Sequence, residues 1–137
     1  MSQARKARGM RTQLVVAQWF QKAGFEFADS AGAGRTGSDI LNVPGLAIEV
    51  KARTGFNPLA WVKQAIEARR AGELPQVVMR CNGQGEATVG DWIVLRPLRE
   101  DTRLLYEAGY IPDPNVPWLL ENVYEEMPGN QHDARDS

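Results

Sequence analysis

The stretch GSDILNVPGLAIEVKA, residues 37–52, decides how this chain folds. Its second half, residues 46–52, alternates larger apolar side chains with small or charged ones, which is typical of a strand whose two faces differ. The turn NVPG, residues 42–45, contains proline and glycine at its end, a strong signal for chain reversal. The segment therefore predicts a hairpin in which a short strand at residues 39–41 runs back alongside the longer one.

Three charged residues stand in this hairpin, namely Asp39, Glu49 and Lys51. Glu49 and Lys51 lie two positions apart, so they share a strand face at about 7 Å spacing, and the turn returns Asp39 alongside them. One interpretation is a solvated strand face with an ion pair worth at most about 1 kcal/mol. The other is a divalent-metal site, because Mg²⁺ binds one or two carboxylates together with waters and phosphate oxygens.

The remainder of the chain predicts helices and strands in alternation, and hence an α/β sandwich with a mixed sheet of four or five strands. A glycine-rich loop is expected over residues 29–38. In the second helix, Leu59, Val62 and Ile66 are expected to form the buried stripe, and Trp61 is expected to pack rather than to stack on bases. Helices are expected over residues 7–23, 57–71 and 98–108, and further strands over residues 25–28, 75–81 and 91–97.

Length and composition predict one domain over residues 1–112, followed by a proline-containing acidic tail, residues 113–137, that is expected to be partly disordered. No apolar run approaches the roughly 20 residues of a membrane span, and no signal region follows the amino terminus. The single cysteine, Cys81, excludes an internal disulfide and predicts a reducing cytoplasm. The single histidine, His132, leaves no Cys/His zinc pattern.

The net charge of −1 hides a strong asymmetry along the chain. Residues 1–80 carry a balance of +6, and residues 81–137 carry −7. A basic half is the electrostatic footprint expected of a polyanion binder, although scattered solvated charges are an equal alternative. The first helix opens with a cluster of cations that we expect to contact phosphates: Arg5, Lys6, Arg8 and Arg11.

The arrangement of Asp39, Glu49 and Lys51 resembles the core of PD-(D/E)xK nucleases. The segment GRTGSDILNVPGLAIEVKARTGFNPLAWVKQAIEARRAG, residues 34–72, is similar to small resolvase-like members in phages of actinobacteria, which are in turn similar to archaeal Holliday-junction resolvases. The resemblance covers most of the domain and is strongest over residues 34–64. It implies a restriction-endonuclease-like core with the order α-β-β-β-α-β.

The same resemblance implies the roles of the site residues. Asp39 and Glu49 would hold Mg²⁺, for which Mn²⁺ would substitute, and the backbone carbonyl of Val50 would be a further ligand. Lys51 would orient or deprotonate the attacking water, or offset charge on the phosphate. Gln64, one turn after Trp61, matches a glutamine that related nucleases place near the site, and an ordinary surface glutamine is the alternative.

One departure concerns the first helix. Many resolvase-like members carry a glutamate eleven residues before the glycine that ends this helix, and here Gln13 stands eleven residues before Gly24. A glutamine can hold a metal-bound water by hydrogen bonding but supplies no negative charge. Metal binding is therefore expected to be weaker than in those members, or the chain to be partly or wholly inactive. An ordinary helix glutamine that bonds a neighbouring backbone group is an equal alternative for Gln13.

Three further residues are candidates for contact with DNA. Ser30 and Arg35 belong to the glycine-rich loop, which in a resolvase could close on the strand being cut, and Arg53 follows Lys51. An ordinary flexible connection is an equal alternative for the loop. The sequence contains no helix-turn-helix or zinc finger, so any selectivity is expected to be for DNA shape.

The expected function is therefore Mg²⁺-dependent endonucleolytic cleavage of branched DNA in phage recombination or replication, in the cytoplasm of the host cell. Symmetric cutting of a four-way junction needs two sites, which predicts a homodimer. Two alternatives remain open: a non-catalytic DNA-structure-binding protein that keeps the nuclease fold, and a flap or single-strand nuclease on the same scaffold.

Overall fold

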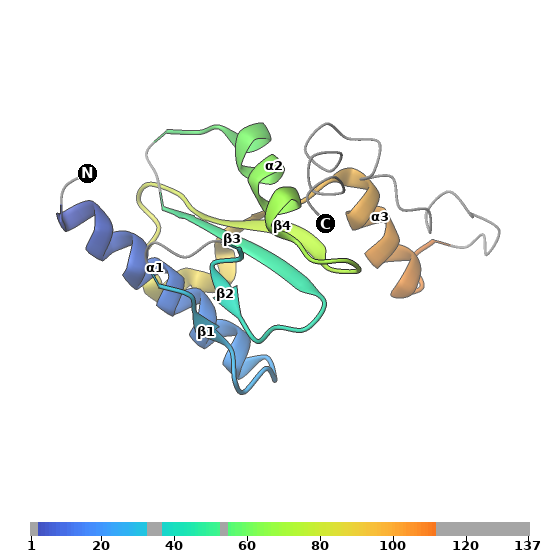
Figure 1. The fold of residues 1–137 in the computed structure, drawn as a ribbon, viewed down its shortest axis with the longest axis horizontal. Coiled ribbons are helices and arrows are strands. Elements are labelled where there is room, and N and C mark those ends of the chain that lie inside the picture. The colour runs from blue at the N-terminus through green and yellow to red at the C-terminus, as the bar shows by residue number, and fades with distance from the viewer. Residues whose placement is uncertain (1–2, 33–36, 53–54, 112–137) are drawn as a thin grey trace.

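A computed structural model describes residues 3–32, 37–52 and 55–111, which form an α/β arrangement (Figure 1). In this part of the chain, no helix combines the length and the apolar character needed to cross a membrane. The elements in chain order are α1 (Gln3–Lys22), β1 (Asp29–Ser30), β2 (Ile40–Leu41), β3 (Leu46–Ala52), α2 (Pro58–Ala68), β4 (Leu74–Arg80), the 3-10 helix η1 (Glu86–Asp91), β5 (Ile93–Leu95) and α3 (Leu98–Glu107).

The strands form a mixed three-stranded sheet and a separate two-stranded ribbon. In the sheet, β3 and β4 are parallel along their whole length, and β5 is antiparallel to β4. In the ribbon, β1 and β2 are antiparallel. The expected mixed sheet is confirmed, but the expected four or five strands are divided between two sheets. A backbone hydrogen bond from the Asp39 N–H to the Ile48 carbonyl, at 2.8 Å, links the ribbon to β3.

Two helices cover opposite faces of the three-stranded sheet (Figure 1). On the first face, Val15 and Val16 of α1 pack with Ile48 and Val50 of β3 in one hydrophobic cluster. On the second face, α2 packs against β4 in another cluster that includes Trp61, Ala65, Val77 and Met79. Because successive strand residues point to opposite faces, Glu49 and Lys51 must point toward the α2 face.

The hairpin turn follows directly from its sequence. The Leu46 N–H donates to the Val43 carbonyl at 3.2 Å, with Pro44 and Gly45 at the two central positions. Gly45 has φ +87°, the left-handed value that a type II turn requires at this position. Asn42, at φ +63°, is a residue type that tolerates this region, and its side chain donates to the Phe27 carbonyl at 3.0 Å. The turn thus fixes the return of β3 past Asp39.

The prediction of a strand at residues 25–28 is wrong, because these residues form the cap at the end of α1. The Phe25 N–H donates to the Phe20 carbonyl at 3.0 Å, and the Gly24 N–H donates to the Gln21 carbonyl at 3.1 Å. With Gly24 at φ +121° and an edge-to-face contact between Phe20 and Phe25, this is a Schellman cap. Pairing begins only at β1, and α1 itself starts at Gln3 rather than at residue 7.

The buried side of α2 matches the expected stripe only in part. Ile66 is buried and Val62 is partly buried, as expected, but Leu59 is 80% exposed, and Trp61 and Ala65 are buried instead. Trp61 also meets Phe56 edge to face, with ring centroids 5.9 Å apart, so its expected packing role is confirmed. The helix ends at Ala68 rather than residue 71, because the following residue adopts extended backbone geometry. The stripe shifts because Trp61 offers more apolar area to β4 than Leu59 does.

The connection from β4 to β5 contains a 3-10 helix that was not expected from the sequence. The Trp92 indole N–H donates to the Gly85 carbonyl at 3.1 Å, and the Arg80 guanidinium lies 5.3 Å from the indole ring centre. Arg11 of α1 binds Glu86 through both carboxylate oxygens. These contacts hold residues 86–92 against the rest of the fold, so the expected strand at residues 91–97 is shortened to β5.

Candidate active site

Asp39 is held beside β3 by two hydrogen bonds. Its carboxylate oxygen Oδ2 accepts from the Val50 N–H at 2.8 Å, and its own N–H donates to Ile48. The Asp39 side chain therefore takes the place of the backbone carbonyl of a neighbouring strand as the acceptor for the Val50 N–H. The bond fixes one carboxylate next to the segment that carries Glu49 and Lys51, so the hairpin brings the three charged residues together as the sequence predicts.

Glu49 is almost completely buried, with 3% of its surface exposed. Burial, the negative charge of Asp39 and a hydrogen bond with that side chain together raise the pKa of the Glu49 carboxyl group to about 8, against the opposing effect of Lys51. At neutral pH the Glu49 carboxyl group therefore retains its proton. A divalent cation could replace that proton, because it supplies the positive charge that two adjacent carboxylates need.

Lys51 is also buried, with 9% of its surface exposed, and its ammonium group has a specific partner. Lys51 Nζ donates to Gln64 Oε1 at 2.7 Å. Gln64 projects from α2, the helix that covers this face of the sheet. The expected nearness of Gln64 to the charged hairpin is thus observed, and its amide holds the lysine in a fixed position.

The chemistry of these donors fits a hard cation such as Mg²⁺. The donors are two carboxylates, Asp39 and Glu49, and one Asp39 oxygen is already committed to Val50. Across the described residues, no group of three or more acidic, histidine or cysteine side chains is positioned to bind a metal. A cation here would therefore depend on water, backbone or phosphate oxygens for the rest of its coordination shell.

Gln13 lies on α1, and the structure bears on one of its two expected roles, a hydrogen bond to a backbone group. Its Oε1 is buried and accepts no hydrogen bond from any residue of the described part, so the alternative in which this oxygen bonds a neighbouring backbone group is not observed. The α1 helix packs on the face lined by Ile48 and Val50, whereas Glu49 points to the α2 face. No hydrogen bond joins Gln13 Oε1 to the three charged residues.

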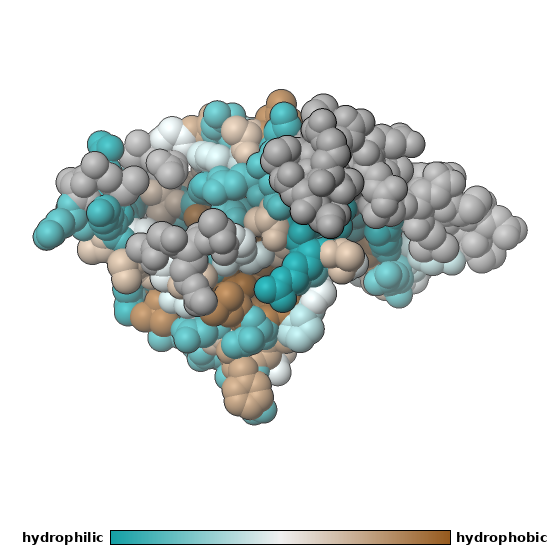
Figure 2. Space-filling model, viewed as in Figure 1, coloured by the Kyte–Doolittle hydropathy of each residue, from teal (hydrophilic) through white to brown (hydrophobic). Residues whose placement is uncertain are grey.

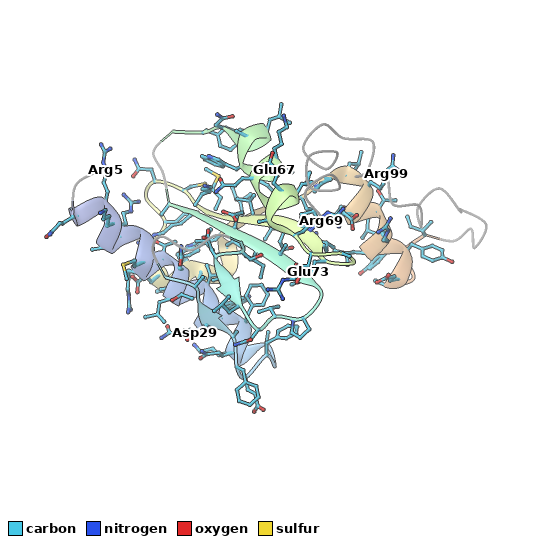
Figure 3. The ribbon with its side chains drawn as sticks, viewed as in Figure 1. Arg5, Asp29, Glu67, Arg69, Glu73 and Arg99 are labelled. Carbon is cyan, nitrogen blue, oxygen red and sulfur yellow. The ribbon has the colours of Figure 1, made fainter. Side chains whose placement is uncertain are left out.

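The basic residues of α1 divide into two groups. Arg5, Lys6 and Arg8 lie on exposed turns near the amino-terminal end of the helix, where Figure 3 labels Arg5 and Figure 2 shows hydrophilic surface. Arg11 is instead engaged with Glu86, with its Nη2 2.8 Å from Oε1, and this contact raises the pKa of Arg11 and lowers that of Glu86. Phosphate contact by Arg11 would have to compete with this ion pair.

The other expected DNA-contacting residues lie apart from these cations or outside the description. Ser30 belongs to β1, where it pairs with Ile40, so it is a strand residue rather than part of an open loop. Its N–H donates to Asp29 Oδ1 at 2.8 Å. Arg35, Arg53 and the expected tail, residues 113–137, lie outside the described residues.

Two interactions at the site were not anticipated from the sequence. The bond from the Val50 N–H to Asp39 depends on hairpin register, which the sequence alone leaves open. The bond between Lys51 and Gln64 joins residues in two elements; the family resemblance places Gln64 near the site but does not specify Lys51 as its partner. No family model, curated protein sequence or solved structure matches this chain.

Proposed function

We propose that this chain is a Mg²⁺-dependent endonuclease of the PD-(D/E)xK type that hydrolyses phosphodiester bonds in branched DNA. The observation that carries the proposal is the buried pair of carboxyl groups, Asp39 and Glu49, beside the anchored ammonium group of Lys51. Burying three ionisable groups together costs stability, and such arrangements cluster at functional sites. The order α-β-β-β-α-β of the described elements is consistent with the restriction-endonuclease-like core.

In this proposal Asp39 and Glu49 would hold the cation, with the Val50 carbonyl as a further donor. Bound Mg²⁺ would supply a Lewis acid for the scissile phosphate and lower the pKa of a water molecule. Lys51 contributes a positive charge that stabilises the negative charge developing on the phosphate. In the overall reaction a water oxygen adds to phosphorus, one phosphorus–oxygen ester bond breaks, and a proton passes to the leaving oxygen.

The exposed cations of α1 support a polyanionic substrate. Figure 1 shows the start of α1 and the end of β3 that carries Lys51 on the same side of the molecule. Arg5, Lys6 and Arg8 would bind phosphates there without reading bases, which suits recognition of DNA shape. A homodimer is part of the proposal for symmetric cleavage of four-way junctions, and the host cytoplasm is its proposed location.

A labelled four-way junction, a flap and a linear duplex, each incubated with Mg²⁺, Mn²⁺ or EDTA, test the proposal. Cleavage is expected with either cation and not with EDTA. Asp39→Asn and Glu49→Gln should abolish it while leaving junction binding in EDTA intact. Glu67→Gln, at an exposed position of α2 labelled in Figure 3, is the matched control and should cleave normally. Normal cleavage by Asp39→Asn would refute the assignment.

A non-catalytic DNA-structure binder is the second candidate, and one observation favours it. The site offers two acidic side chains rather than three, because Gln13 is uncharged and Oε1 makes no described hydrogen bond. This candidate predicts junction binding that is indifferent to Mg²⁺, with no cleavage products at any cation concentration. Cleavage of flaps or single strands in preference to junctions would instead indicate a different nuclease on the same scaffold.

A further inference from the structure

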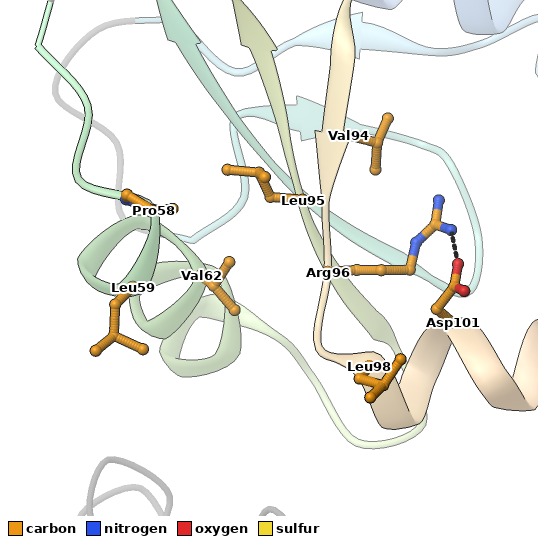
Figure 4. Close-up of a pocket in the computed structure, with 8 residues that line it drawn as sticks. All are labelled: Pro58, Leu59, Val62, Val94, Leu95, Arg96, Leu98 and Asp101. Carbon is orange, nitrogen blue, oxygen red and sulfur yellow. Dashed lines mark hydrogen bonds and ion pairs between the residues drawn. The ribbon is translucent and has the colours of Figure 1, made fainter.

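An open groove lined mainly by apolar side chains is separate from the site formed by Asp39, Glu49 and Lys51. It has a volume of about 590 Å³ and lies between α2, β5 and α3. Figure 4 shows Val62 of α2 and Leu98 of α3 on either side of it, with Leu95 of β5 between them. Leu59 and Leu98 are 80% and 81% exposed, values unusual for leucines that border one cavity.

The third wall of the groove, α3, has an apolar stripe without a close partner among the described elements. Leu98 and Leu105 lie two helical turns apart on the same side of α3, and both are exposed. The helix packs only sparsely on the rest of the described chain. The groove therefore lacks apolar cover among the described elements.

We propose that residues 116–120 of the same chain, with the sequence VPWLL, dock in this groove. They form a short run of apolar residues in the segment that follows α3, and they include Trp118, whose ring alone can bury roughly 150–250 Å². Leaving such a run in water forgoes about 25 cal/mol for every Å² of apolar surface that docking would bury.

The chain can reach the groove, because α3 ends in a reversal. The Tyr110 N–H donates to the Leu105 carbonyl at 2.8 Å, the Gly109 N–H donates to the Tyr106 carbonyl at 3.0 Å, and Gly109 has φ +87°. This Schellman cap turns the chain back. The ten residues of α3 span about 15 Å, and residues 111–116 when extended cover about 17 Å, so the segment can return to Leu98.

The covalent connection to α3 also favours this occupant over an unrelated apolar partner. Tethering adds an effective concentration in the millimolar range for a short linker, which a free partner lacks.

The test follows the fluorescence of Trp118 in the full-length chain, obtained as the difference between wild type and Trp118→Phe. We expect blue-shifted emission and protection from acrylamide quenching that do not change with protein concentration. The double variant Leu59→Lys with Leu98→Lys should shift the emission to the red and increase quenching several-fold. Both leucines are mostly exposed, so far-ultraviolet circular dichroism should confirm an intact fold.

The matched control is Phe27→Lys, because Phe27 is 73% exposed and lies between α1 and β1, away from the groove. This variant should leave the Trp118 signal unchanged. Quenching of Trp118 as in a free peptide in the wild type would overturn the proposal. Protection that appears only at high protein concentration would overturn it as well, because the groove would then be filled by a second copy. Neither outcome depends on nuclease activity.

Discussion

The two faces of β3 follow opposite rules, although their residues alternate along one strand. Ile48 and Val50 pack against α1 in an apolar cluster, whereas Glu49 and Lys51 are buried beneath α2. The first face lowers the free energy of the fold through apolar burial. The second raises it through desolvation of ionisable groups. The first face therefore accounts for stability, and the cost of the second is what the proposed catalytic role would explain.

The largest effect on stability is expected on the apolar face. Ile48→Ala removes a side chain with no exposed surface and should lower the free energy of unfolding by about 2–5 kcal/mol. Urea denaturation monitored by circular dichroism measures the change. Phe27→Ala, at a mostly exposed position, is the control and should change stability by less than about 0.5 kcal/mol. Equal losses in the two variants would contradict the assignment of this face to the core.

On the charged face, Glu49→Gln should raise the free energy of unfolding rather than lower it. The folded state raises the pKa of Glu49 from about 4.5 to about 8, so it binds the proton more tightly than the unfolded state. The resulting stability is present below pH 4.5 and is lost as the pH rises to 8. Glu49→Gln avoids this loss, so its advantage over wild type should grow from near zero at pH 4.5 to a few kcal/mol above pH 8.

Thermal unfolding from pH 4.5 to 9 measures this difference. Glu73→Gln serves as the control, since Glu73 is not among the residues that shift the Glu49 pKa. Added Mg²⁺ should stabilise the wild type most at alkaline pH and should not stabilise Glu49→Gln. A variant that is destabilised equally at every pH would show that Glu49 contributes favourably to the fold.

A smaller effect is expected from the residue that positions Lys51. Gln64→Leu removes the acceptor of the lysine ammonium group and should slow cleavage by about 10–100-fold, mainly in kcat. It should also lower the free energy of unfolding by about 1–3 kcal/mol, because the buried ammonium group loses its hydrogen bond. Gln64→Glu keeps an acceptor and should restore much of the rate. The exposed Gln18→Leu on α1 controls for a general effect of the substitution. Equal cleavage rates for Gln64→Leu and Gln18→Leu would show that Gln64 does not contribute to the proposed reaction.

The smallest effect concerns the cations of α1 and separates Arg8 from Arg11. Arg8→Ala should reduce the slope of log affinity against log salt concentration by about 1, as expected for loss of one phosphate contact. Arg11→Ala should leave the slope nearly unchanged, because Arg11 is engaged with Glu86. Junction binding in EDTA across a salt series measures both slopes. A larger loss for Arg11 than for Arg8 would contradict the division into two groups.

The sequence predicted the parts of the fold that depend on local pattern. The alternation over residues 46–52 and the turn at Pro44 and Gly45 are both present in β3 and its hairpin. The parts that failed depend on tertiary competition. Phe25 alternates like a strand residue but is used to cap α1, and Leu59 has helical spacing but yields the buried position to Trp61.

The candidate site was predictable in its residues but not in its bonds. Spacing along one strand places Glu49 and Lys51 on one face, and a turn of known type returns Asp39. The spacing does not specify that Asp39 binds the Val50 N–H, that Gln64 holds Lys51, or that Gln13 Oε1 makes no described bond. Each of these depends on the register or rotation of an element relative to another.

The parallel pairing of β3 with β4 has a consequence for the order in which the site is assembled during folding. The hairpin closes through contacts near in sequence, so Asp39 can meet β3 early. Gln64, in contrast, reaches Lys51 only when the crossover helix α2 packs on the face of the sheet formed by β3 and β4. A chain stalled before that step would possess both carboxyl groups yet leave its ammonium group unanchored, so the proposed activity should emerge only at the end of refolding.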